Sequence, residues 1–142
     1  MAKMNPYLNF DGKAEDAFNF YKSVFGGEFS ALHKMGGNPG SENLSDDEKN
    51  RIMHIALPID SNTVLMASDT LPSMGHVLNH GNNVQLSLHP ESREEADRLF
   101  NGLSEGGKVD MPLQDTFWGA YFGNFQDKYG INWMVNYEGK QQ

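Results

Sequence analysis

The residue best suited to acid–base chemistry in this sequence is His54, within the segment 51–57. The segment alternates as a strand does, so that Ile52, His54 and Ala56 share one face. A histidine that faces a pocket can act as a general base or a hydrogen-bond donor near neutral pH. We therefore take His54 as the candidate catalytic residue. The alternative is a structural histidine, either bonded to a neighbouring carbonyl or exposed at a sheet edge.

Three other histidines have spacings that bear on metal or ligand binding. His33 lies on the preceding expected strand, and pairing of the two strands would bring it near His54, so we expect it to help bind a ligand. Two histidines without a carboxylate make a weak metal site. His76 and His80 are four residues apart, the spacing for chelation on a helix, but nearby Gly and Pro predict a solvated loop. We predict no metal site from these residues.

Aromatic side chains are concentrated between residues 117 and 137. Alternation along an expected strand puts Trp118 and Phe122 on one face, and Tyr121 on the other, where Gly119 and Gly123 leave space beside it. The core needs at least half of these rings, and the rest can line a pocket for an apolar or aromatic ligand. The expected ligand-binding residues are these aromatics and a set of neutral amides: Trp118, Tyr121, Phe122, Asn5, Asn9, Asn83, Gln85 and Asn132.

An internal repeat positions these residues. Residues 5–10 and 83–88 share a strand pattern 78 residues apart, and each is followed by apolar residues at helical spacing, in 11–26 and 92–107. The second helix opens with the capping box of Ser92 and Glu95. Period-two segments complete each half: 28–35, 52–59 and 63–68, then 108–113, 118–125 and 131–137. The repeat predicts two βαβββ modules with helices outside and a concave binding surface inside.

Composition limits the class of protein. The chain has 142 residues, no Cys and a net charge of −8. This charge disfavours binding to nucleic acid and to anionic membranes, and no apolar run is long enough to cross a membrane. The N-terminus lacks the apolar region of a secretory signal, so we expect a cytoplasmic protein. A polar, Gly-rich insertion, 36–49, is either a mobile surface loop or a lid over a site.

Specific segments of this repeat resemble a known superfamily. With Tyr7-Leu-Asn-Phe10, Ala17-Phe-Asn-Phe-Tyr-Lys-Ser-Val-Phe-Gly26 and Asp127-Lys-Tyr-Gly-Ile-Asn-Trp-Met134, the chain resembles the glyoxalase/bleomycin-resistance/dioxygenase group, or vicinal oxygen chelate superfamily. Residues 117–136 are most similar to PhnB-like proteins. The resemblance implies an α+β glyoxalase-like fold in one domain, 1–142, with βαβββ modules in 1–70 and 83–142 and a linker in 71–82. It also implies a homodimer.

The metal enzymes of this superfamily carry ligands in the first and last strands of each module. Alignment of the repeat puts Asn5, Met66, Asn83 and Met134 at these positions. Neutral amides and thioethers are poor ligands for a hard divalent ion, so we expect neither a metal nor another cofactor. Some relatives are labelled quinone methyltransferases, but this chain lacks a glycine-rich strand-to-helix turn of the kind that binds nucleotide-like cofactors.

Three hypotheses about function follow. The first is metal-independent binding of a small, uncharged or weakly polar organic molecule in the concave pocket. The second is a lyase or dioxygenase-like enzyme that uses a divalent metal in an atypical site with His54 and His33. The third is a structural or interaction module in which the aromatic hairpin forms an interface. Whether the protein is an enzyme is left open.

Overall fold

The structure, a computed structural model, describes residues 1–139. It divides into two compact units, residues 1–79 and the described residues from 80 onward. The last three residues of the second expected module therefore lie outside the described part. The expected boundaries at residues 70, 71, 82 and 83 remain predictions.

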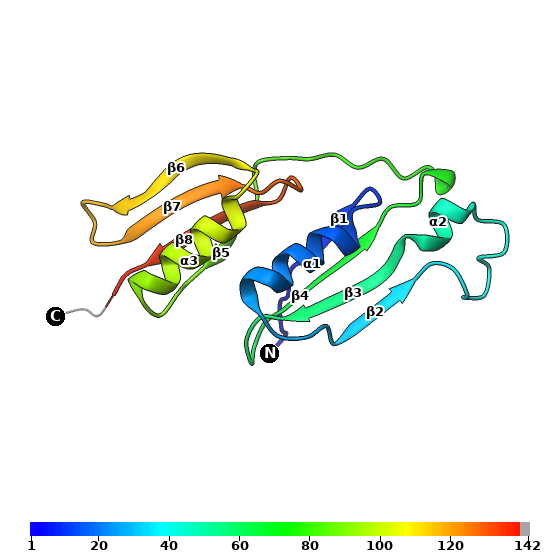
Figure 1. Cartoon of the computed structure of the whole chain (residues 1–142), viewed down its shortest axis with the longest axis horizontal. Helices are drawn as coiled ribbons and strands as arrows, with labels where there is room; N and C mark the ends of the chain where they lie inside the picture. Colours follow the sequence, from blue (N-terminus) through cyan, green and yellow to red (C-terminus); the bar gives the residue numbers. More distant parts are fainter. Residues whose placement is uncertain (140–142) are drawn as a thin grey trace. The chain divides into compact units, whose positions relative to one another are not determined.

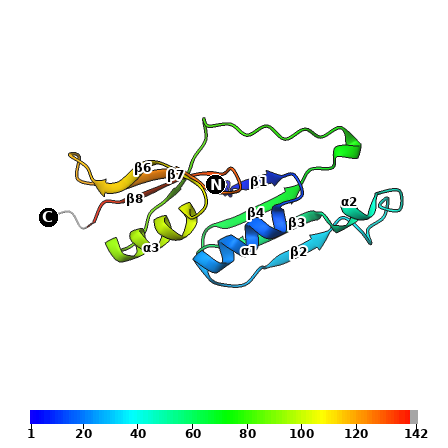
Figure 2. The ribbon, with the colours of Figure 1, turned by 45° about the horizontal axis from the view of Figure 1, so that its top comes forward.

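The first unit is one mixed sheet with a helix on one face (Figures 1 and 2). The strand order is β1-β4-β3-β2, with β1 parallel to β4 and the other neighbours antiparallel. Its elements are β1 (Tyr7–Phe10), α1 (Ala14–Phe25), β2 (Ala31–Lys34), α2 (Asp46–Asn50), β3 (Ile52–Pro58), β4 (Val64–Asp69) and the 3₁₀ turn η1 (Pro72–Met74).

Helix α1 forms where the apolar spacing predicts it. Ala17, Phe18 and Tyr21 recur on one face and are fully buried against the sheet. Acidic residues in its first turn and Lys22 in its last turn interact favourably with the helix dipole. Gly26 ends the helix with a positive φ of 82°.

The second unit repeats this topology. Its strand order is β5-β8-β7-β6, again with a parallel first pair and two antiparallel pairs, and α3 lies on one face (Figures 1 and 2). Its elements are β5 (Leu86–Leu88), α3 (Arg93–Ser104), β6 (Lys108–Asp115), β7 (Tyr121–Gln126) and β8 (Asn132–Tyr137). The two βαβββ modules and the α+β class are confirmed.

Helix α3 begins at the predicted cap. The Ser92 hydroxyl accepts a hydrogen bond from the backbone N–H of Glu95, at 3.0 Å, and the Glu95 carboxylate accepts one from the N–H of Glu91, at 2.9 Å. The apolar stripe predicted for this helix is buried; it consists of Ala96, Leu99, Phe100 and Leu103.

Several strands are shorter than the sequence patterns suggest. The first strand begins at Tyr7 because Pro6 has no N–H to donate, although its carbonyl accepts a bond from Met66 N at 3.1 Å. The strand expected over 118–125 begins at Tyr121, because residues 116–120 form a hydrogen-bonded turn. The strand expected over 28–35 is formed only over Ala31–Lys34, although Ser30 and Met35 also donate backbone hydrogen bonds, to the carbonyls of Ala56 and Arg51.

The insertion of residues 36–49 contains the start of α2, which the sequence patterns did not predict. Ser45 caps this short helix, and the buried carboxylate of Glu48 accepts a bond from the backbone N–H of Ser73 at 3.0 Å. That bond lowers the pKa of Glu48 below its usual value. The insertion is thus joined to the η1 segment. Among residues 1–139, no helix is long and apolar enough to cross a membrane.

Candidate ligand-binding faces

Each sheet has one face covered by its helix and an opposite face that we call open. Because neighbouring residues across a ladder point to the same side, the strand registers define both faces. The first open face carries Tyr7, Asn9, Ala31, His33, His54, Ala56, Val64, Met66 and Ser68. The second carries Ser87, Lys108, Met111, Gln114, Phe122, Asn124, Gln126, Asn132, Met134 and Asn136.

Tyr7, His33 and His54 form a polar cluster on the first open face. His33 is the direct cross-strand partner of His54, as the sequence suggested for paired strands. The Tyr7 hydroxyl lies 3.1 Å from Nδ1 of His54, and the two rings stack with centroids 5.7 Å apart. The cluster can exchange hydrogen bonds with a bound polar group, because Tyr7 is 45% exposed.

The two asparagines of this region differ in role. Asn9 lies on the open face, where its Oδ1 is 3.4 Å from the Ser68 hydroxyl. Asn5 lies before β1, and its Oδ1 accepts a bond from the backbone N–H of Val64 at 3.0 Å. That bond fixes the start of β4, so the acceptor of Asn5 is already used in holding the sheet together.

Neutral amides dominate the second open face. Asn132 donates from Nδ2 to the carbonyl of Gly81 at 2.8 Å, and Asn124 Oδ1 accepts from the backbone N–H of Met111 at 3.0 Å. These bonds hold the two amides in place while leaving one polar atom of each for a ligand. Asn83 and Gln85 lie on the exposed segment that precedes β5. They are close to β5 in the sequence but take no part in its strand pairing.

An aromatic pair, Phe117 and Trp118, stands at the tip of the β6–β7 hairpin and is called the aromatic tip. Phe117 is 97% and Trp118 58% exposed. Their rings meet edge to face at 5.1 Å, and the Trp118 ring lies 6.2 Å from that of Phe122 on the second open face. Trp118 and Phe122 are therefore neighbours, as predicted, although Trp118 belongs to a turn.

Tyr121 lies on the helix-covered side, away from Trp118 and Phe122. Its hydroxyl donates to Asp97 Oδ1 at 2.5 Å, and the guanidinium carbon of Arg93 lies 3.9 Å from its ring centroid. The hydrogen bond to Asp97, with burial and the charge of Asp97, raises the pKa of the phenol.

At Gly123, the space that the sequence suggested beside Tyr121 is filled, whereas Gly119 in the turn has open space beside it. Gly123 faces Phe100 and the β6 backbone, and a Cβ there would lie 2.7 Å from Cε2 of Phe100. The glycine allows helix and strand to approach closely, and no pocket is formed at this position.

The strand registers revise the alignment of the superfamily's metal positions. Tyr7 pairs with Met66 and Ser87 pairs with Met134, so the offset between the first strands is 80 residues and not 78. Met66 and Met134 are equivalent, as predicted, but Asn5 and Asn83 lie outside β1 and β5.

The residues at the first and last strands do not fit a hard divalent ion. These residues are Met66 and Met134, which carry thioethers, Tyr7, which carries a phenol, and Ser87, which carries a hydroxyl. They provide no anionic carboxylate and no imidazole. Over residues 1–139, no three His, Cys, Asp or Glu side chains form a group that could hold a metal ion.

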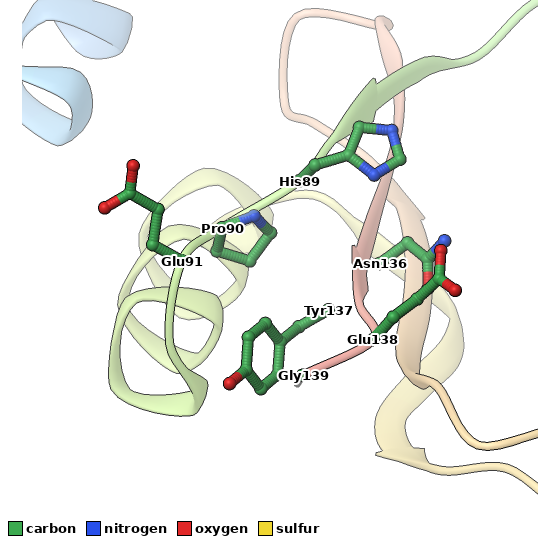
Figure 3. Close-up of a pocket in the computed structure, with 7 residues that line it drawn as sticks. All are labelled: His89, Pro90, Glu91, Asn136, Tyr137, Glu138 and Gly139. Carbon is green, nitrogen blue, oxygen red and sulfur yellow. The ribbon is translucent and has the colours of Figure 1, made fainter. Parts of the chain in front are cut away.

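Two open hollows lie where the outer strands end. One, of ≈ 380 Å³, is lined by residues 89–91 and 136–139 (Figure 3). In it, the side-chain oxygen of Asn136 is buried and has no hydrogen-bond partner among the described residues. Nε2 of His89 lies 3.0 Å from the Ser87 hydroxyl. The other, of ≈ 470 Å³, is lined by Asn9, residues 68–70 and residues 76–78.

Comparisons with known proteins agree over nearly the whole chain. A family model described as 3-demethylubiquinone-9 3-methyltransferase matches residues 2–136. Protein YjdN of Escherichia coli is 32% identical over 143 residues, which cover 94% of this chain and 93% of YjdN. The structure of PA1353 from Pseudomonas aeruginosa is 41% identical, with a TM-score of 0.86 and coverage of 99% and 100%. A PhnB protein from Bacillus cereus, described as a putative 3-demethylubiquinone-9 3-methyltransferase, is 28% identical, with a TM-score of 0.76 and coverage of 96% and 99%. The chain belongs to the PhnB-like family.

The PhnB-like fold extends to the wider superfamily. A glyoxalase/bleomycin resistance protein/dioxygenase family enzyme from Burkholderia phytofirmans is 16% identical, with a TM-score of 0.56 and 95% coverage of both chains. At this identity the likeness concerns the fold alone. The resemblance drawn from the sequence motifs is thus confirmed for family and fold.

Some residues of the open faces in this PhnB-like chain were missed by sequence reasoning. Tyr7 was read only as part of a strand pattern, and its contact with His54 depends on the parallel pairing of β1 with β4. Phe117 is not among the ligand-binding residues expected from the sequence, whereas the turn exposes it together with Trp118. The signal for that turn was Thr116 with Gly119, whose φ is +95°.

Proposed function

We propose that this chain binds a small, planar, uncharged or weakly polar organic molecule without a metal ion, and that it does so as a cytoplasmic homodimer. The observation that carries the proposal is the series of rings from Phe117 through Trp118 to Phe122, which begins in solvent and ends on the second open face. Exposing such rings to water is unfavourable, and planar ligands stack readily on them. The proposed binding residues are Trp118, Phe122 and Asn132, with Asn83 and Gln85 at the edge.

The polar groups of the second open face favour an uncharged ligand. None of the residues that define this face is acidic, and Lys108 is its one basic residue. Amides offer both donors and acceptors, which suits ring oxygens, hydroxyls or ring nitrogens of a planar molecule. His54, His33, Asn9 and Tyr7 are the corresponding candidates on the first open face, with His54 as the group able to move a proton.

Methyl transfer, the reaction in the family's description, is not part of this proposal. The turns between first strand and helix, 11–13 and 89–92, hold one glycine between them, Gly12. A glycine-rich turn is what lets a backbone approach a nucleotide-like cofactor. Asn5, whose side-chain oxygen bonds Val64, is proposed as a residue that supports the sheet and not as one that contacts the ligand.

The binding test uses the two indole N–H signals of ¹⁵N-labelled protein, with 2-naphthol as the probe. Trp133 donates its indole N–H to Asp127 at 2.8 Å in the core, whereas Trp118 is exposed, so the two signals serve as internal control and reporter. We expect 2-naphthol to shift the Trp118 signal and leave Trp133 unchanged. Naphthalene-2-sulfonate, with the same rings and a charge, should bind more weakly.

Two variants complete this test. Trp118→Ala should weaken 2-naphthol binding by about tenfold or more, because one stacked ring contributes about 1–3 kcal/mol. Met53→Ala, which removes an exposed apolar side chain in the first unit, should leave binding unchanged. If Trp118→Ala binds as well as the wild type, the aromatic tip is not the binding site; if it loses the dimer instead, the tip is an interface.

Native mass spectrometry of untagged protein purified without chelator tests the metal and the dimer. A metal-free dimer, alone or with an organic molecule, supports the proposal. A stoichiometric divalent ion in the folded dimer contradicts metal independence, and a monomer contradicts the dimer.

One observation favours a second candidate, a lyase or dioxygenase-like enzyme that uses a divalent metal in an atypical site. His33 and His54 are direct cross-strand partners, and imidazoles suit Zn²⁺, Cu²⁺ or Ni²⁺. Only two imidazoles meet there, which makes a weak site unless the substrate adds ligands. If native spectra show a bound ion that is lost in both His33→Asn and His54→Asn but kept in His80→Asn, this second candidate replaces the first.

A further inference from the structure

The turn that presents the aromatic tip is internally rigid. The Thr116 hydroxyl donates to the carbonyl of Ala120 at 2.7 Å and accepts from the N–H of Ala120 at 3.1 Å. The backbone N–H of Thr116 also bonds that carbonyl at 2.8 Å, and Gly119 bonds back to Thr116 at 3.2 Å. A turn closed by four hydrogen bonds has little freedom to fold its exposed rings back onto the protein.

Helix α3 also holds both strands of the hairpin where they enter the turn. On the β6 side, Arg93 donates to both carboxylate oxygens of Asp115, at 2.8 Å and 3.2 Å. On the β7 side, Tyr121 donates to Asp97 and lies beneath the Arg93 guanidinium. Asp115 and Tyr121 are cross-strand partners, so the two contacts hold the same residue pair of the β6–β7 ladder.

The spacing on the helix explains why the two contacts occur together. Arg93 and Asp97 are four residues apart, one helical turn, and therefore point from the same side of α3. Figure 1 shows the first turn of α3 and the β6–β7 turn at the same end of the unit. The hydrogen bond from Arg93 lowers the pKa of Asp115, and the bond to Asp97 raises that of Tyr121, so both contacts persist at neutral pH.

We propose that Arg93 and Asp97 are positioning residues that hold the aromatic tip in its binding orientation, an inference that rests on the proposed function. Neither residue touches the ligand. Each acts through the cross-strand pair of Asp115 and Tyr121, which directly precedes and follows the turn. The two residues thereby fix the position of the aromatic tip relative to Phe122. A recognition element that is already ordered loses less entropy when its ligand binds.

The test compares order and affinity in the same variants. We expect Arg93→Gln and Asp97→Ala to lower the heteronuclear ¹H–¹⁵N NOE of the Trp118 indole, while the NOE of the Trp133 indole stays unchanged. Affinity for 2-naphthol should fall by about threefold to tenfold in each variant, because the tip must then lose conformational entropy when the ligand binds. Arg93→Lys keeps the charge but not the paired hydrogen bonds, and should recover only part of the loss.

Controls separate this inference from the proposed function. Glu94→Gln changes a neighbouring exposed charge on the same turn of α3 and should alter neither readout. An unchanged Trp118 NOE in both Arg93→Gln and Asp97→Ala overturns the inference, as does a lowered NOE with unchanged affinity. If the wild type binds no 2-naphthol, the proposed function fails for this ligand class; the Trp118 NOE then decides alone whether Arg93 and Asp97 order the tip.

Discussion

His33 lies directly across from His54 on the neighbouring antiparallel strand, and Tyr7 reaches His54 on the same face from β1, across the intervening strand β4. Three side chains from β1, β2 and β3 thereby meet on one open face, although they are separated by as many as 47 positions in the sequence. The helix covers the opposite face, so this cluster is not needed to build the core. Its members are available for a ligand in a way that the buried residues next to them are not.

Replacement of His54 separates a functional role from a structural one. We expect His54→Ala to lower the free energy of unfolding by less than about 1 kcal/mol, because the ring is half-buried and makes one exposed hydrogen bond. Ile55→Ala is the matched control: the next residue on β3 is fully buried and should cost about 2–4 kcal/mol. Urea unfolding measures both values. Equal losses would show that His54 is structural.

The unpartnered oxygen of Asn136 predicts a stabilising substitution. A buried carbonyl without a donor costs about 1–3 kcal/mol, so Asn136→Leu should raise the free energy of unfolding by about 1 kcal/mol. Asn132→Leu, on the same face of β8, removes the bond to Gly81 and should lower it instead. Thermal unfolding of both variants provides the comparison. If both substitutions destabilise equally, Asn136 has a partner in solution, such as a bound water.

The fold could be predicted from the sequence because its signals are local and occur twice. The cap at Ser92 and the apolar stripe from Ala96 to Leu103 each act within one helix, and the repeat supplies the topology. Strand registers were less predictable, since they depend on pairings between distant segments. Tyr7 pairs with Met66 and Ser87 pairs with Met134, so the two first strands are related by an offset of 80 residues. The local sequence pattern instead predicts an offset of 78.

The candidate site was predictable only in part, for the same reason. Alternation correctly associated Trp118 with Phe122, but it could not reveal that Tyr121 is held by Asp97 on the helix-covered side. It also assigned residues 118–120 to a strand, whereas the hydroxyl of Thr116 helps to close them into a turn. A hydrogen bond between a side chain and the backbone is invisible to periodicity, yet here it helps to decide which rings reach the solvent.

Asp69 is expected to stabilise the first unit. Its buried carboxylate accepts from the backbone N–H of Ala14 through Oδ1, at 3.0 Å, and from that of Ile52 through Oδ2, at 2.8 Å. Asp69→Asn turns one acceptor into a donor that faces an N–H, and should cost about 1–3 kcal/mol.

A second aspartate provides the control for Asp69. Asp60 also accepts two backbone N–H groups, from Asn62 and Thr63, but through Oδ1 alone and in an exposed turn. An asparagine keeps that oxygen, so Asp60→Asn should change the free energy of unfolding by less than about 0.5 kcal/mol. Chemical denaturation that finds the same loss for both would contradict the role given to the second oxygen of Asp69.

The contacts that hold the aromatic tip should depend on pH at both extremes. Arg93 depresses the pKa of Asp115, so the stability from this pair is present above the ordinary aspartate value of about 3.9 and is lost as pH falls through the lowered pKa. Asp97 raises the pKa of Tyr121, so that bond is fully present below the ordinary tyrosine value of about 10 and is lost as pH rises through the raised pKa.

Between about pH 4 and pH 10, both contacts should therefore be intact. Absorbance of tyrosinate at alkaline pH measures the upper limit: the difference between wild type and Tyr121→Phe isolates the titration of Tyr121. We expect this titration to lie above that of an ordinary tyrosine, and to move back towards it in Asp97→Asn, because the hydrogen bond to Asp97 is the largest cause of the shift. If Asp97→Asn leaves the titration where it is, burial and not the hydrogen bond dominates. The β7 side of the hairpin is then held less firmly by α3 than the 2.5 Å contact indicates.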